Sequence, residues 1–149
     1  MKILFLDVDG VIAPVGADHQ YIFDPDCLTQ LKRILSEVSN TRIVLSTSWR
    51  EGFSLFHFGW LWRHHGIGPD WVIDSTPLLE DRPRSAEIQQ WLQDSGPRYK
   101  VDRYAVLDDE PEWLEGLPIE ALFVCEPKVG LTDPMAAKMI QYLSIGMAA

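Results

Sequence analysis

Short apolar runs alternate along this chain with stretches of helical period, and this alternation constrains the fold more than any other feature. The first run, Lys2–Val8 (KILFLDV), is almost continuously apolar, which is typical of a strand buried on both faces of a sheet. Strands that alternate with helices predict a parallel sheet with helices packed on both of its faces. The sequence therefore predicts an α/β fold whose chemistry lies at the carboxyl ends of the strands.

Five strands and four helices are expected along the chain. Proline in the first helical turn marks two helix starts, after Asp24 and after Asp133. The further strands are expected at Arg42–Leu45, Trp71–Ile73, Tyr104–Leu107 and Ala121–Val124. The helices are expected from Pro25 to Val38, from about Glu51 to His65, over Arg84–Leu92 and from Thr132 to Leu143. This order gives a Rossmann-like three-layer sandwich with a mostly parallel, five-stranded sheet.

The composition is that of one globular domain spanning residues 1–149. Hydrophobic residues make up 46% and charged residues 23% of the chain, which excludes a disordered or fibrous protein. The first apolar run stops at Asp7, short of the roughly 7–15 residues of the apolar region of a signal peptide. No stretch approaches the roughly 20 apolar residues of a membrane span. We expect a soluble, cytoplasmic protein.

The net charge of the chain is −9. This balance argues against broad, nonspecific nucleic-acid binding, which goes with a basic surface. It leaves room for a local basic patch, for which the candidates are Arg50, Arg63, Arg82 and Arg84. Nucleic acid is therefore a partner that the net charge disfavours without excluding. Acidic residues also serve magnesium sites, so their placement matters more than their number.

The first strand ends in Asp7-Val8-Asp9-Gly10. An Asp-Gly pair commonly closes a hairpin, which is one interpretation of Asp9 and Gly10. A carboxylate at Asp7 is harder to explain structurally, because a charge at the end of a buried strand must be paired or bound to a metal. Asp7 and Asp9 are therefore candidate catalytic and metal-binding residues.

Polar groups also follow two later strands and begin one helix. Ser46 and Thr47 follow the second strand, where they either cap the next helix or offer hydroxyl and backbone N–H groups to a phosphate. Asp108 and Asp109 follow the fourth strand, and adjacent carboxylates repel each other unless they are solvated or share a divalent cation. Arg84 stands at the head of a helix, where the dipole disfavours a cation. A bound phosphate would explain that position.

The order of these groups is more specific than any one of them. Asp-x-Asp after the first strand, Ser/Thr after the second, a basic residue before a helix and Asp-Asp after the fourth strand resemble the haloacid dehalogenase-like (HAD) superfamily of phosphohydrolases. The resemblance extends from Lys2 to about Ser144. Three stretches are most similar to small HAD domains related to bacterial RNA-repair proteins: Asp7–Val11, Val44–Arg50 and Arg84–Ile88.

The resemblance implies a magnesium-dependent phosphomonoesterase and a role for each of these residues. Asp7 would attack phosphorus and form an aspartyl-phosphate, and Asp9 would act as general acid and base. Ser46 or Thr47 would bind the phosphoryl group, with Arg84 neutralising its charge. The implied Mg²⁺ ligands are oxygens of Asp7, the Asp9 backbone carbonyl and one of Asp108 and Asp109.

HAD enzymes often carry a cap domain, and this chain has little room for one. Residues 10–45 already hold a loop, a helix and a strand, which leaves only Ile12–Phe23 as a flap. We therefore expect no large cap and an open site, which the resemblance connects with large substrates such as a phosphorylated polymer or protein. Two alternatives remain: a weakly active or non-catalytic binding module on the same scaffold, and a phosphatase that processes nucleic-acid ends.

The segment 53–62 is rich in aromatic residues on all sides of its expected helix. Such a helix is either deeply buried or forms an interface. We expect burial, with a homodimer through this segment as the alternative. The aromatic residues are Phe53, Phe56, Phe58, Trp60 and Trp62.

Overall fold

The computed structural model describes residues 1–16, 23–51 and 54–146. Five parallel strands form one sheet in the order β3-β2-β1-β4-β5. This confirms the predicted Rossmann-like α/β fold, and the described residues contain no cap domain. Part of the expected flap, residues 17–22, lies outside the described residues. The strands are β1 (Lys2–Leu6), β2 (Thr41–Leu45), β3 (Val72–Ser75), β4 (Arg103–Asp108) and β5 (Leu122–Val124).

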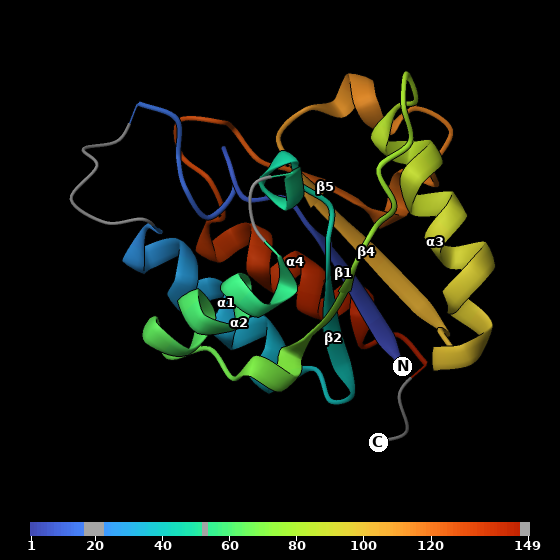
Figure 1. Ribbon diagram of the computed structural model, residues 1–149. Coiled ribbons are helices and arrows are strands. Elements are labelled where there is room, and N and C mark those ends of the chain that lie inside the picture. The colour runs from blue at the N-terminus through green and yellow to red at the C-terminus, as the bar shows by residue number, and fades with distance from the viewer. Residues whose placement is uncertain (17–22, 52–53, 147–149) are drawn as a thin grey trace.

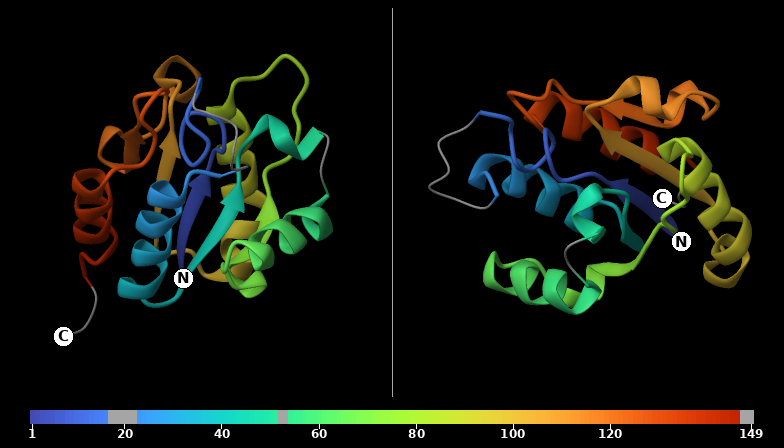
Figure 2. Two further views of the ribbon diagram at one scale, coloured as in Figure 1. Left: turned by 90° about the vertical axis from the view of Figure 1, so that its left-hand side faces the viewer. Right: turned by 45° about the horizontal axis from the view of Figure 1, so that its top comes forward.

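The α-helices of the described residues cover both faces of the sheet (Figures 1 and 2). Helix α3 (Arg84–Tyr99) lies on one face. On the other face lie α1 (Pro25–Glu37), α2 (Leu55–His64) and α4 (Asp133–Leu143). None of these helices is long and apolar enough to cross a membrane.

The central strand β1 is buried on both faces, as its continuous apolar run predicts. Successive residues of a strand point to opposite sides of the sheet. Leu4 and Leu6 pack into the core on the side of α1 and α4. Phe5 packs on the other side, where its ring meets Trp91 of α3 edge-on at 5.5 Å between ring centroids. The two cores together fix the position of β1 in the middle of the sheet.

The register of the central strands brings three polar residues into one row at the carboxyl edge. Leu6 of β1 pairs with the last residue of β2 and with Leu107 of β4. Two backbone hydrogen bonds extend this register by one residue, from Ser46 N to Leu6 O and from Asp7 N to Leu107 O. The next positions on the three strands are Ser46, Asp7 and Asp108, which we call the site row.

Helix α2 begins later than the sequence predicts. Residues Ser48–Glu51 form a 3-10 turn, η1, instead of the first turn of the helix. The helix begins at Leu55, because the hydroxyl of Ser54 accepts a hydrogen bond from the backbone N–H of His57 and caps the helix there. The predicted start at Glu51 is therefore wrong.

Helix α3 continues beyond the predicted stretch, which ended at Leu92, to Tyr99. It includes Pro97 in its last turn. The rings of Trp91 and Tyr99, two turns apart, stack with their centroids 5.8 Å apart. This contact ties the last turns of the helix to its buried face. The end of the helix is set by Lys100, which adopts a left-handed backbone conformation.

The expected burial of the aromatic segment holds for one face of α2 and is wrong for the other. Phe58 and Trp62 are fully buried. Phe56 and Trp60 are 82% and 63% exposed. Residues four apart share a face of a helix, so the two pairs lie on different faces and only one meets the core. Phe53 lies outside the described residues.

Candidate active site

Three carboxylates from two strand ends meet at the carboxyl edge of the sheet. Asp7, Asp108 and Asp109 each offer an oxygen atom, and these atoms all lie within 4.8 Å of one another. Asp7 and Asp108 are buried, whereas Asp109 is partly exposed. They come together because β1 and β4 are neighbours whose register places Asp7 beside Asp108.

The guanidinium of Arg84 joins the ends of β1 and β4. Its Nη1 donates to Asp7 Oδ2 at 3.1 Å and to both carboxylate oxygens of Asp108 at 2.8 Å. These bonds explain how a cation is stable at the first residue of α3, where the helix dipole disfavours it. The sequence argument anticipated a phosphate at this position, and the residues that Arg84 binds in the structure are carboxylates.

Backbone N–H groups fix the orientation of the two buried carboxylates. Asp108 Oδ1 accepts hydrogen bonds from the N–H groups of Asp109 and Glu110, at 2.7 and 3.0 Å. Asp7 Oδ1 accepts one from the N–H of Val8, at 2.8 Å. The second oxygen of Asp7 lies toward Arg84, at 3.1 Å from its Nη1. The strand ends themselves therefore hold these side chains in place.

The cluster carries more negative than positive charge. Three carboxylates and one guanidinium give a net charge of −2 when all are ionised. Burial, together with the charge of Asp108, raises the pKa of Asp7 to about 8, although Arg84 acts in the opposite direction. Burial also raises the pKa of Asp109. A divalent cation would remove this excess of charge, and oxygen-only ligands are those that Mg²⁺ prefers.

The two candidate hydroxyl groups after β2 differ in their partners. Thr47 Oγ1 accepts a hydrogen bond from the N–H of Trp49, at 3.3 Å. Ser46 Oγ is buried and has no hydrogen-bond partner among the described residues. A buried hydroxyl without a partner costs about 1–3 kcal/mol, and this one stands next to Asp7 in the site row. The geometry therefore favours Ser46 over Thr47 as the group that meets a phosphoryl oxygen.

The turn after β1 presents Asp9 and brings the backbone against Asp109. The carbonyl of Val8 accepts hydrogen bonds from the N–H groups of residues 11, 12 and 13. Gly10 has a φ of +77°, and a Cβ there would lie 2.2 Å from Asp109 Oδ2. Asp9 itself is exposed on this turn. Since β1 pairs only with parallel strands, the hairpin interpretation of Asp9 and Gly10 is wrong.

Sequence reasoning missed one buried acid on the helix that carries Arg84. Glu87, in the first turn of α3, is 5% exposed. Its Oε2 accepts a hydrogen bond from the N–H of Leu79, at 2.9 Å. This bond ties the loop before α3 to the helix that carries Arg84. An acid in the first helical turn was the available signal, since such residues commonly bind nearby backbone N–H groups.

Comparison with known protein families identifies the family of this chain. Residues 3–136 match the family model described as the HAD domain in Swiss Army Knife RNA repair proteins. The chain belongs to this family. The matched stretch contains every residue of the cluster and the strands of the described sheet, except the first residue of β1. No curated protein and no solved structure matches the chain.

Family membership confirms the resemblance that the order of the motifs predicts. It makes the HAD domain a phosphohydrolase scaffold in general terms. The arrangement of individual residues comes from the site itself: Arg84 binds both Asp7 and Asp108, Asp109 lies beside these carboxylates, and Gly10 lies against Asp109.

Proposed function

We propose that this HAD domain is a Mg²⁺-dependent phosphomonoesterase that works through an aspartyl-phosphate at Asp7. The observation that carries the proposal is the site row. In it, a buried carboxylate lies between Asp108 and the unpartnered hydroxyl of Ser46. The carboxylate has the position of a nucleophile, and the hydroxyl has the position of a group that binds the phosphoryl oxygens of its target.

The donor set fits magnesium. Asp7, Asp108 and Asp109 would hold the ion, with the backbone carbonyl of Asp9 as a further oxygen ligand. Bound there, Mg²⁺ would offset the excess negative charge and polarise the phosphoryl oxygens. Asp108 already receives two backbone N–H groups and Arg84. Asp109, which is more exposed, has more freedom to turn toward an ion.

The chain's own residues account for both halves of the reaction. A carboxylate oxygen of Asp7 attacks phosphorus, the bond to the leaving oxygen breaks, and Asp9 gives that oxygen a proton. Asp9 then takes a proton from a water molecule that attacks the same phosphorus. The bond to Asp7 breaks and inorganic phosphate leaves. Ser46 binds a phosphoryl oxygen throughout, and Arg84 stabilises the charge on the transferred group.

The open edge of the sheet favours hydrolysis over transfer to a second substrate. Phosphotransfer requires that water be kept away from the phosphorylated carboxylate. The described residues contain no cap that would cover the site, and Asp9 is exposed on its turn. Among the described residues, nothing would therefore keep water from the phosphoryl group that the buried Asp7 carries after the first half of the reaction.

The substitution Asp7→Asn tests the proposal, with p-nitrophenyl phosphate as substrate and Mg²⁺ present. It should lower the rate of phosphate release more than about a hundredfold, because covalent catalysis is lost. Asp102→Asn is the matched control: it is the same change at the opposite end of the β1–β4 pair and should leave the rate unchanged. Circular dichroism checks that both variants fold.

A residual rate above about a hundredth in Asp7→Asn would overturn the role of Asp7. If the wild-type protein binds Mg²⁺ but releases no phosphate from any ester, the binding module becomes the better interpretation. A phosphate ester panel that includes sugar phosphates and phosphorylated oligonucleotides separates these outcomes.

A further inference from the structure

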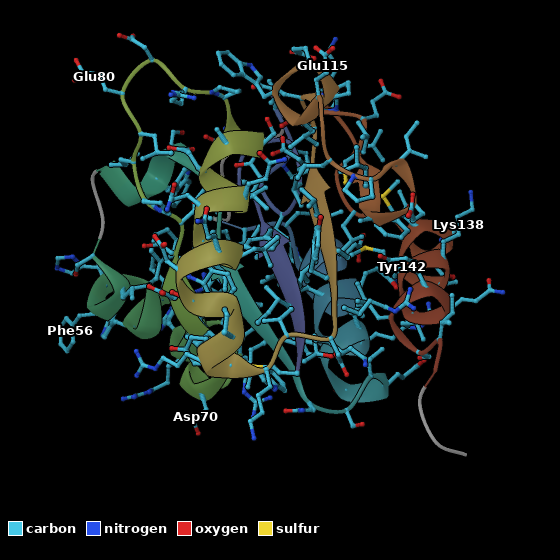
Figure 3. All side chains as sticks on the ribbon, turned by 90° about the vertical axis from the view of Figure 1, so that its right-hand side faces the viewer. Phe56, Asp70, Glu80, Glu115, Lys138 and Tyr142 are labelled. Carbon is cyan, nitrogen blue, oxygen red and sulfur yellow. The ribbon has the colours of Figure 1, made fainter. Side chains whose placement is uncertain are left out.

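Helix α2 carries a stripe of exposed ring side chains, Phe56, Trp60 and His64, which we call the α2 ring stripe. These residues are four apart in sequence and therefore lie along one face of the helix. Phe56 and Trp60 are 82% and 63% exposed, and His64 is exposed as well. The rings of Trp60 and His64 stack, with centroids 5.7 Å apart and planes 8° from parallel. Figure 3 shows Phe56 pointing away from the molecule.

The segment that carries the stripe has no acidic residues. Residues 54–69 contain no Asp or Glu, between Glu51 and Asp70, in a chain whose net charge is −9. Arg63 and His57 of α2 are exposed. Lys32 of α1 adds a cation near the end of the helix, because its Nζ lies 3.1 Å from where a Cβ on Gly66 would stand. Flat rings and cations thus occur together here.

We propose that the α2 ring stripe binds single-stranded nucleic acid. Bases stack on Phe56 and Trp60, and Arg63 contacts the phosphodiester backbone. Aromatic rings beside cations are the combination with which proteins bind single strands, since every base has a face that stacks and every linkage carries a negative charge. A polyanion repelled by the acidic remainder of the chain can approach the protein at α2.

A second copy of the chain is a poorer occupant of this surface. In a two-fold contact the same patch faces itself. Arg63 and the histidines of each copy would find no acidic partner in such a contact, because residues 54–69 contain no Asp or Glu. A polyanion, by contrast, complements the charge of the patch.

Binding of a single strand at α2 goes beyond the proposed function, because it requires no catalytic step. Delivery of a phosphorylated end to Asp7 rests on the proposed phosphatase. The ring centroid of Trp49 in η1, which follows Ser46 and Thr47, lies 6.2 Å from that of Phe58 on the buried face of α2.

The test measures binding of a short fluorescent RNA strand with a terminal phosphate, by anisotropy, and of DNA with the same sequence. Trp60→Ala should weaken binding about tenfold, and Phe56→Ala/Trp60→Ala further, because each stacked base is lost. Ile119→Ala is the matched control, since Ile119 is 83% exposed and lies in η4 (Ile119–Ala121), far along the chain. It should leave the affinity unchanged.

A salt series tests the phosphate contact. The logarithm of the affinity should fall with the logarithm of salt concentration with a slope of roughly −1 to −3, and Arg63→Gln should make this slope shallower by about 0.7. Arg98→Gln, an exposed arginine on α3, should leave the slope unchanged. Binding of RNA and DNA alike supports stacking, and a preference for RNA supports the inference with an additional contact to the ribose.

Three results would overturn the inference: no binding of either strand, equal affinity in Phe56→Ala/Trp60→Ala and Ile119→Ala, or a wild-type dimer that the double variant dissociates. The proposed function fails separately. Hydrolysis of p-nitrophenyl phosphate without strand binding overturns only the α2 surface. Strand binding that depends on Trp60, with no phosphate release that depends on Asp7, supports the α2 surface and overturns only the phosphatase.

Discussion

The two ends of the β1–β4 pair both carry ion pairs, and the pairs differ in exposure. At the amino end, Lys2 Nζ lies 2.9 Å from Asp102 Oδ2, and the side chain of Asp102 is 57% exposed. At the carboxyl end, Arg84 lies 3.1 Å from Asp7 and 2.8 Å from Asp108, whose side chains are 4% and 1% exposed. One pair of strands thus carries an ion pair with an exposed carboxylate at one end and an arrangement of buried carboxylates at the other.

This difference in carboxylate exposure distinguishes a candidate functional site from a surface ion pair. At the amino end, water screens the charges, and such pairs contribute about 0–1 kcal/mol. At the carboxyl end, burial removes that screening, and two carboxylates share one guanidinium beside a third carboxylate, Asp109. In the protein without a ligand, this excess negative charge lowers stability, and a bound cation, alone or together with a phosphoryl group, would offset it. The following predictions test this contrast, from the largest expected effect to the smallest.

Arg84→Ala should destabilise the protein by about 3–5 kcal/mol at neutral pH, because it leaves buried carboxylates without their cation. The free energy of unfolding in urea measures this. Arg98→Ala, which removes an exposed arginine from the same helix, is the control and should change stability by less than about 1 kcal/mol. Equal effects of the two substitutions would show that the buried end behaves like the solvated one.

Gly10→Ala should cost about 1–2 kcal/mol from its positive φ and more from the overlap with Asp109. Gly16→Ala isolates the second effect, since Gly16 has a φ of +78° and a Cβ there would meet none of the described residues within 4 Å. We expect Gly10→Ala to be the more destabilising of the two and to weaken Mg²⁺ binding, measured by calorimetry. Equal stability of both variants, with unchanged Mg²⁺ affinity, would show that the turn has room to shift away from Asp109.

Without a divalent cation, stability should fall as pH rises from about 4 to about 8. The pKa of Asp7 is about 8 in the folded chain and 3.8 when unperturbed. In this range the folded state therefore binds a proton that the unfolded state has lost, so raising the pH favours unfolding. Mg²⁺ should raise the melting temperature more at pH 8 than at pH 5, because protons compete for the same oxygens.

The melting temperature across pH, with and without Mg²⁺, measures this effect. Asp109→Ala should remove most of the Mg²⁺ increment if Asp109 holds the ion, and a sodium salt at equal ionic strength controls for screening. A Mg²⁺ increment that is independent of pH and of Asp109 would place the ion elsewhere.

Asp102→Asn should change stability by less than about 1 kcal/mol. The hydrogen bond from Lys2 lowers the pKa of Asp102. The stability that this pair contributes is therefore present above the ordinary pKa of an aspartate and is lost as pH falls through the lowered value. The variant should therefore be slightly less stable than the wild type near neutral pH, approach the wild type in acid, and show no change in its Mg²⁺ response. A loss of several kcal/mol at neutral pH would contradict the contrast between the two ends.

The sequence predicted the fold because its signals are local. The continuous apolar run of β1 and the proline after Asp24 depend on neighbouring residues, and each element that they predict is present. The polar groups that follow the strands can likewise be identified from neighbouring residues alone. Boundaries were less predictable: whether a helix starts at Glu51 or Leu55 depends on which residue caps it, and Ser54 does so here.

Other features of the site and of α2 depended on contacts between distant residues. Apolar periodicity does not distinguish Phe58 from Phe56, because only the packing of α2 on the sheet decides which face is buried. In the same way, Ser46 and Thr47 are equivalent as a sequence pattern. Their difference arises because the register of β2 with β1 puts Ser46 in the row of Asp7.

The sequence by itself determined the order of strands and helices and the chemical groups at the strand ends, since both follow from side-chain type and local period. The tertiary structure decided which of these groups meet. Arg84 is 77 residues from Asp7 and 24 from Asp108, and it binds both because α3 begins beside the ends of two adjacent strands. Burial there raises the pKa of Asp7, which favours a bound proton or a cation at this carboxylate. No local pattern carries that information, because burial and register belong to the assembled sheet.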